Sequence, residues 1–485
     1  METDLDAQRY GMRNLEIEGE VDGEALEGKP MTLRLAADAE ADLGADVLTV
    51  SGLELAAGEL MTTGDLEVHQ LTGKPQLQGA IKVAPFNPRE LLARLGQPAP
   101  ETTDPKALTR FEFSANLKGT PKRVDLDPLS LTLDYTTLTG KLGVAPGATA
   151  LRFELTADAL DADRYLPPRT KEAPQAAATP GAAAGAAPLP LDTLRALDID
   201  GRMRLGQLKV SNLTSRDIQV TVNAKNGLIK VSPIQAALYD GTYTGDVVLD
   251  ARSDTPRISM NETLSGVQAE PLLADLQGKA LLSGRADASA KLNARGLGPA
   301  QFKRTLNGDI AFSFADGALK GINIGRILRD VEARLKGQAL PAGEGPVETD
   351  FTELSGTIQI KDGVATNRDL SAKSPLLRIS GQGTANLVEE TVDYRLTTTL
   401  AATAEGQSGA EASELAGIPV PIRVSGSWRN PTIRPDLEAV AKAKAKEEVD
   451  KRKEEVAEKI EKKIEKELGE GAAEPLKGLL KGFGN

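Results

Sequence analysis

The feature that most constrains this chain is a period-two alternation of apolar and polar residues, repeated in short segments along most of its length. Examples lie at residues 33–37, 111–117, 129–135, 151–155, 218–222, 392–396 and 422–428. Because successive side chains of a β-strand point to opposite faces, each segment predicts a strand with one apolar and one wet face. Dipeptides that favour tight hairpin turns separate such segments at Asn226-Gly227, Asp240-Gly241, Asp316-Gly317 and Asp362-Gly363. We therefore predict a mainly β fold built on a long antiparallel sheet.

A second pattern places a glycine at the centre of many of these segments, in phase with the apolar residues. Such a glycine removes a side chain from the apolar face, so the sheet either bends there or leaves space for something else to lie. The sequence leaves these two readings open, and both predict a curved, twisted sheet. The expected bending positions are Gly79, Gly140, Gly245, Gly308, Gly356 and Gly381.

Helices are predicted at two kinds of place. Asn87 before Pro88 and Asp161 before Ala162 are typical N-caps, and they predict short helices interspersed among the strands. A Lys/Glu-rich periodic segment near the end predicts a long C-terminal α-helix. An Ala/Pro/Gly-rich run at 171–191 is predicted to be a linker or insertion. It separates a β segment at 1–170 from a second β segment at 192–435, and charged amphipathic helices follow at 436–485.

Composition excludes several kinds of active site. The chain has no cysteine and one histidine, His69, so thiol nucleophiles, disulfides and Cys/His zinc sites are ruled out. The sequence contains no P-loop and no GxSxG elbow. A net charge of −12 argues against a nucleic-acid partner, because phosphate contacts need a basic surface. We expect no enzyme, no catalytic or metal-ligating residue and no cofactor.

What remains is a long sheet with one apolar face. Left open as a trough, that face would expose more contiguous apolar area than a soluble monomer carries without a ligand. Acyl chains suit it, because burial stabilises them by about 25 cal/mol per Å² without directional contacts while head groups stay in water. The residues expected to line the trough are Ile81, Val83, Phe111, Phe113, Leu131, Leu133, Val220, Val222, Ile310, Phe312, Ile358, Ile360, Ile379, Leu396 and Val424.

The end of the chain carries a small cationic amphipathic segment. Lys477 and Lys481 flank an apolar set that is typical of contact with an anionic membrane surface. Packing of the same segment against the last strands is the alternative. The apolar residues concerned are Leu476, Leu479, Leu480 and Phe483.

Several sequence motifs, in the same order, resemble the AsmA family. The resemblance covers most of Leu15–Leu437 and is carried by Pro85–Leu92, Leu133–Gly140, Tyr239–Gly245, Gly266–Leu273, Leu306–Gly308, Asp316–Ile324, Gly417–Pro421 and Gly426–Pro431. It implies a Gram-negative envelope protein held in the inner membrane by an N-terminal helix, with its bulk in the periplasm. It also implies the taco-like β-groove shared with TamB and bridge-like lipid transfer proteins.

The implied function is non-enzymatic. The resemblance implies binding or conduction of phospholipid between the inner and outer membranes, in support of outer-membrane lipid homeostasis and assembly. The alternative is a scaffold or chaperone-like factor for outer-membrane protein assembly. Implied partners are phospholipids, the inner membrane and outer-membrane assembly factors. Because this sequence shows neither the family's N-terminal anchor nor an export signal, we expect it to be a fragment or to carry a wrong start.

Overall fold

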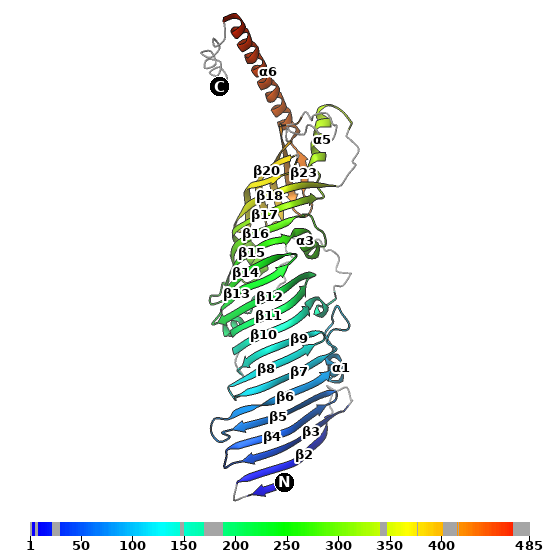
Figure 1. Cartoon of the computed structure of the whole chain (residues 1–485), viewed down its shortest axis with the longest axis vertical. Helices are drawn as coiled ribbons and strands as arrows, with labels where there is room; N and C mark the ends of the chain where they lie inside the picture. Colours follow the sequence, from blue (N-terminus) through cyan, green and yellow to red (C-terminus); the bar gives the residue numbers. More distant parts are fainter. Residues whose placement is uncertain are drawn as a thin grey trace. The chain divides into compact units, whose positions relative to one another are not determined.

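The computed structural model describes residues 2–4, 8–21, 30–145, 150–168, 188–339, 347–375, 377–400, 415 and 417–468 (Figure 1). Strands dominate, and the 23 described strands belong to one open sheet. This confirms the predicted mainly β fold. The chain forms two compact units, Met1–Phe312 with Gln359–Gly363 and Ser313–Ile358 with Val364–Asn485, so the division falls inside the segment predicted at 192–435.

The first unit consists mainly of strands that pair in chain order through hairpins. The strands are β1 (Glu2–Asp4), β2 (Arg9–Val21), β3 (Met31–Asp42), β4 (Val47–Ala57), β5 (Leu60–His69), β6 (Gln76–Phe86), β7 (Phe111–Thr120), β8 (Arg123–Leu133), β9 (Thr136–Val144), β10 (Ala150–Asp161), β11 (Asp198–Val210), β12 (Leu213–Lys225), β13 (Leu228–Leu238), β14 (Gly241–Asp250), β15 (Arg257–Gln268) and β16 (Arg285–Arg295). β17 (Asn307–Lys320) begins in this unit and ends in the second.

The sheet departs from the predicted antiparallel order at one described pair. β10 and β11 are parallel, with Leu155 opposite Met203. Parallel neighbours need a long return connection, because the chain must travel back to the edge where the first strand began. The connection after β10 contains the segment predicted as a linker at 171–191, of which residues 171–187 lie outside the described part of the chain.

Short helices follow several strands, as predicted. α1 (Pro88–Arg94) follows β6, η2 (Ala162–Tyr165) follows β10 and α3 (Ala269–Gln277) follows β15, while α2 (Leu191–Ala196) precedes β11 and α4 (Pro299–Arg304) follows β16. Both predicted N-caps are confirmed: Asn87 accepts the N–H groups of Arg89 and Glu90, and Asp161 accepts that of Asp163. The predicted long helix is α6 (Leu437–Leu468). The predicted membrane-contact segment at 476–483 lies outside the described residues.

The second unit contains a closed apolar core. Its strands are β18 (Glu348–Lys361, shared with the first unit), β19 (Val364–Lys373), β20 (Leu377–Asn386), β21 (Thr391–Leu400), β22 (Pro419–Ser427) and β23 (Thr432–Pro435). A helix absent from the sequence prediction, α5 (Ile324–Leu335), packs on them through Ile324, Leu328 and Val331, together with Val440 of α6. Asn323 caps α5 by accepting the N–H of Arg326.

Candidate functional site

An uninterrupted row of cross-strand partners crosses thirteen strands of the first unit, from β4 to β16. Its central members on β10, β11 and β12 are Leu155, Met203 and Val220. Residues that are direct partners project from the same face of a sheet, so the row defines one face, which we call the apolar face. The opposite face is the outer face. In chain order the row is Leu53, Gly64, Ile81, Ala115, Leu129, Gly140, Leu155, Met203, Val220, Ile234, Gly245, Glu262 and Ala290.

Eight of the predicted lining residues share this face of the first unit. Ile81 and Val220 belong to the row itself, and the pairing of Val83 with Phe113 and of Phe113 with Leu131 runs beside it. The others are Phe111, Leu133 and Val222. The ring of Phe111 lies 5.5 Å from that of Phe86, centroid to centroid. All eight are half-buried.

The remaining predicted lining residues lie in β17 to β22. Ile310 and Phe312 of the first unit are half-buried, as are Ile358 and Val424 of the second, whereas Ile360 is 6% exposed. Two of the set belong to the core of the second unit, which corrects their expected place on an open face. Ile379 is buried in that core and Leu396 packs against it, because α5 and the start of α6 cover this part of the sheet.

The apolar face of the first unit is buried at some positions, such as Leu129 at 3% exposed, and uncovered at others. Beneath α5, in the second unit, Val420 and Ile422 are each 1% exposed. On the apolar face of the first unit, Ile17 pairs with Leu35 and Leu35 with Leu55, yet Ile17 is 54% and Leu55 39% exposed. Contiguous exposed apolar residues of this kind mark an interaction surface.

One charged residue interrupts the apolar row. Glu262 is half-buried and alternates in phase with Met260 and Leu264, so its carboxylate stands on the apolar face. The hydroxyl of Tyr243 donates to its Oε2 atom at 2.5 Å. Within the described residues Glu262 forms no ion pair. Glu262 is not among the residues predicted from the sequence, although its phase with Met260 and Leu264 could have revealed it.

The glycines make room for different neighbours at different positions. A side chain at Gly140, whose φ is +143°, would collide with the backbone carbonyl of Glu154, so this glycine permits a close approach of β9 and β10. A side chain at Gly245 would instead meet the carboxylate of Glu262 and the hydroxyl of Tyr243. Close backbone also surrounds Gly79 and Gly308, neighbouring side chains surround Gly381, and Gly356 is buried.

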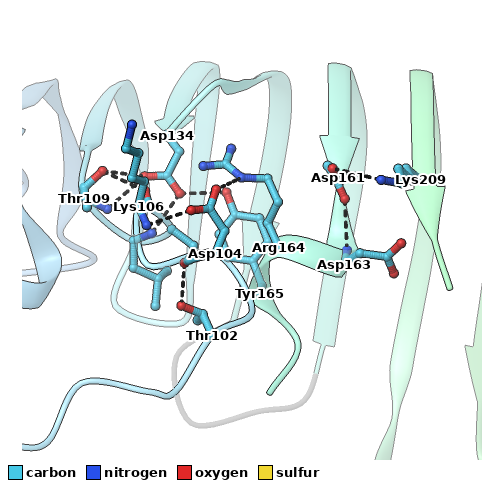
Figure 2. Close-up of polar contacts among 12 residues, drawn as sticks. Thr102, Asp104, Lys106, Thr109, Asp134, Asp161, Asp163, Arg164, Tyr165 and Lys209 are labelled. Carbon is cyan, nitrogen blue, oxygen red and sulfur yellow. Dashed lines mark hydrogen bonds and ion pairs between the residues drawn. The ribbon is translucent and has the colours of Figure 1, made fainter. Parts of the chain in front are cut away.

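Polar contacts fasten one edge of the first unit, as Figure 2 shows around Asp134. Asp134 lies in the β8–β9 turn with φ +53° and is 7% exposed. Its carboxylate accepts the N–H groups of Leu108 and Thr109 at 2.8 Å and that of Arg110 at 3.1 Å, and the hydroxyl of Tyr165 at 2.8 Å. Burial raises the pKa of Asp134, but these donors outweigh it and hold the pKa below 3.8.

Similar contacts recur at other turns along the same edge. Arg164 Nε donates to Asp104 at 2.7 Å, and Asp163 accepts the N–H groups of Ser211 and Asn212 in the β11–β12 turn. Further along, Tyr239 donates to Asp275 of α3 at 2.6 Å. Because these carboxylates bind donors of the chain itself, we interpret the edge as a structural clamp beside the apolar face.

None of the helices in the described part of the chain is both long and apolar enough to cross a membrane. In the same part of the chain, no group of three or more His, Asp or Glu residues is arranged to hold a metal ion.

The comparison with protein families agrees with the motifs. The model of the AsmA family matches residues 2–370. The chain belongs to the AsmA family. It is also similar to "Protein AsmA" of Escherichia coli (strain K12), with 23% identity over 329 residues, which cover 65% of this chain and 53% of the relative. The chain thus spans about half the length of that curated relative.

Proposed function

We propose that this chain binds phospholipid acyl chains on the apolar face of its first unit, without catalysis, and thereby supports lipid and outer-membrane homeostasis of a Gram-negative envelope. Membership of the AsmA family suggests the broader role. The observation that supports lipid binding is the thirteen-strand row, in which every residue except Glu262 is apolar or glycine.

Burial of exposed apolar area would stabilise bound lipid. Alkyl chains laid on this face would remove both their own surface and that of half-buried residues such as Met203 and Val220 from water, at about 25 cal/mol per Å². The interaction needs no direction and no catalytic group. Head groups would stay in water, so conduction between the two membranes requires only that the chains move along the row within a curved, groove-like sheet in the periplasm.

Native mass spectrometry of the protein purified from cells without detergent tests this proposal. Bound masses of phospholipid are expected on the wild-type chain, and Val220→Asp, which places a charge on the apolar face, is expected to lose most of them. Thr221→Asp on the outer face of the same strand is the matched control and should retain them. Absence of lipid from the wild type, or equal retention by both variants, would contradict the proposal.

The same experiment weighs the alternative of a scaffold for outer-membrane protein assembly. A scaffold that uses the apolar face would retain polypeptide rather than lipid, and Val220→Asp would release that polypeptide. The exposed apolar residues of this face, such as Ile17 and Leu55, favour lipid, because a folded protein partner would need polar rim contacts to complement an interface.

A further inference from the structure

A row of arginines crosses the face of the second unit's sheet that lies opposite its apolar core. Arg395 of β21 is the direct partner of Arg423 of β22, and Arg423 is the direct partner of Arg434 of β23. On β22 the preceding residue, Ile422, is buried in the core beneath α5, so Arg423 and its partners stand on the opposite face. All three arginines are exposed. We call Arg395, Arg423 and Arg434 the arginine row.

Such a row destabilises a sheet unless something compensates it. Direct cross-strand partners hold their Cβ atoms about 4.5–5.5 Å apart, and like charges at that separation repel. One carboxylate compensates part of this charge: Asp393 accepts hydrogen bonds from Nε of Arg423 at 3.0 Å and from its Nη2 at 2.9 Å. Neither Arg395 nor Arg434 forms an ion pair with any residue in the described part of the chain.

Arg395 and Arg423 of the arginine row line a hollow of about 450 Å³ on the same unit, whereas Arg434 lies outside its lining. Arg368, from the irregular pairing between β19 and β20, joins Arg395 and Arg423 in its lining, with Gln382, Thr384 and Asp393. Three guanidinium groups therefore meet one carboxylate, on a chain whose net charge is −12. The hollow offers planar N–H donors and hydroxyl and amide groups to an anion.

We propose that the arginine row and Arg368 bind a phosphate group. A phosphate presents several charged oxygens that accept paired N–H donors from guanidinium groups, and its charge would relieve the repulsion between Arg395, Arg423 and Arg434. Both a lipid head group and a free phosphate compound carry this chemistry. The site goes beyond the proposed acyl-chain binding and does not rest on it, since it lies on the second unit whereas the acyl chains are proposed to bind the first.

The test uses the full chain and three variants that each remove one positive charge. Arg395→Gln and Arg434→Gln alter the arginine row, whereas Arg429→Gln alters an exposed arginine outside it, ion-paired with Glu390 at 2.9 Å. Binding of inorganic phosphate is measured by NMR titration, and binding to phosphatidylcholine vesicles with and without phosphatidic acid by flotation. We expect the wild type and Arg429→Gln to bind equally, and each row variant to bind about tenfold more weakly.

The outcomes separate the two sources of phosphate. Binding of inorganic phosphate without flotation supports the proposal with a free compound as ligand, and flotation that requires phosphatidic acid supports it with a lipid head group. Thermal melts of unliganded Arg395→Gln and Arg434→Gln should match or exceed the wild type, because each of these two variants relieves like-charge repulsion. Failure of the wild type to bind either probe, or equal weakening by Arg429→Gln, would overturn the proposal.

Discussion

Gly245 and Glu262 are direct cross-strand partners, and the carboxylate of Glu262 occupies the space that a side chain at position 245 would fill. The hydroxyl of Tyr243, two residues before Gly245, reaches into the same space and donates to that carboxylate. A charged group can therefore stand on the apolar face only because its partner is glycine. Burial raises the pKa of Tyr243, as does its hydrogen bond to Glu262, so the tyrosine remains a donor at neutral pH.

Gly245→Ala is expected to destabilise the first unit. The added methyl group must displace the Glu262 carboxylate and break its hydrogen bond from Tyr243, which should lower the free energy of unfolding by about 1–3 kcal/mol. Gly19→Ala on β2 is the matched control, because a Cβ there has nothing within 4 Å. Urea denaturation followed by circular dichroism makes the comparison, and equal curves for the two variants would refute the crowding argument.

Glu262→Met should strengthen binding of a fluorescent fatty acid if acyl chains occupy the apolar face. Covering the carboxylate with an alkyl chain costs free energy that the thioether does not, so we expect about a tenfold gain in affinity. Glu54→Met, at an exposed position of β4 that alternates with Leu53 and Leu55, is the control and should leave affinity unchanged. A gain of the same size in both variants would point to general charge removal instead.

The sheet and the apolar face could be predicted from the sequence, because both depend on local alternation. Val220 and Val222 share the face on which period two places them, and the cap at Asn87 follows from the preference of Asn and Pro for helix starts. The parallel pairing of β10 and β11 could not be predicted in this way. It depends on where a long connection returns the chain, which alternation within a strand does not encode.

Ile379 lies in a buried core and not on an open face, for a different reason. Its strand alternates like the others, but the coverage of its face depends on α5, which the strand pattern does not include. Ile324, Leu328 and Val331 have the spacing of one helix face, and Asn323 precedes them as a cap, so a search for helical periodicity could have found α5. The arginine row could not be predicted from the sequence either, because its members become neighbours only through the register of the strands.

Tyr165→Phe is expected to loosen the clamp around Asp134. Loss of the hydroxyl leaves one oxygen of a buried carboxylate with a donor fewer, and we expect a cost of about 1–2 kcal/mol in unfolding free energy. Tyr135→Phe is the matched control, because Tyr135 is 76% exposed and lies in the same turn as Asp134. If both variants unfold at the same urea concentration as the wild type, the Tyr165 hydrogen bond contributes no stability.

Acid should weaken the same clamp. The pKa of Asp134 is lowered in the folded state from its ordinary 3.8, so the folded chain binds this proton less readily than the unfolded chain does. Its stabilisation is complete above pH 3.8 and is lost as the pH falls through the lower folded value. Asp134→Asn should therefore be about 2 kcal/mol less stable than the wild type at neutral pH. Urea titrations at decreasing pH should show that gap closing below pH 3.8, and a constant gap would contradict the linkage.

The most direct test of the account is photocrosslinking in living cells from the two faces of one strand. A photoreactive phenylalanine analogue at Val220 lies on the apolar face, and the same group at Thr221 lies on the outer face of β12. Mass spectrometry of the purified adducts is expected to show phospholipid attached at position 220 and none at position 221. Polypeptide adducts at position 220, or lipid at both positions alike, would contradict acyl-chain binding on the apolar face.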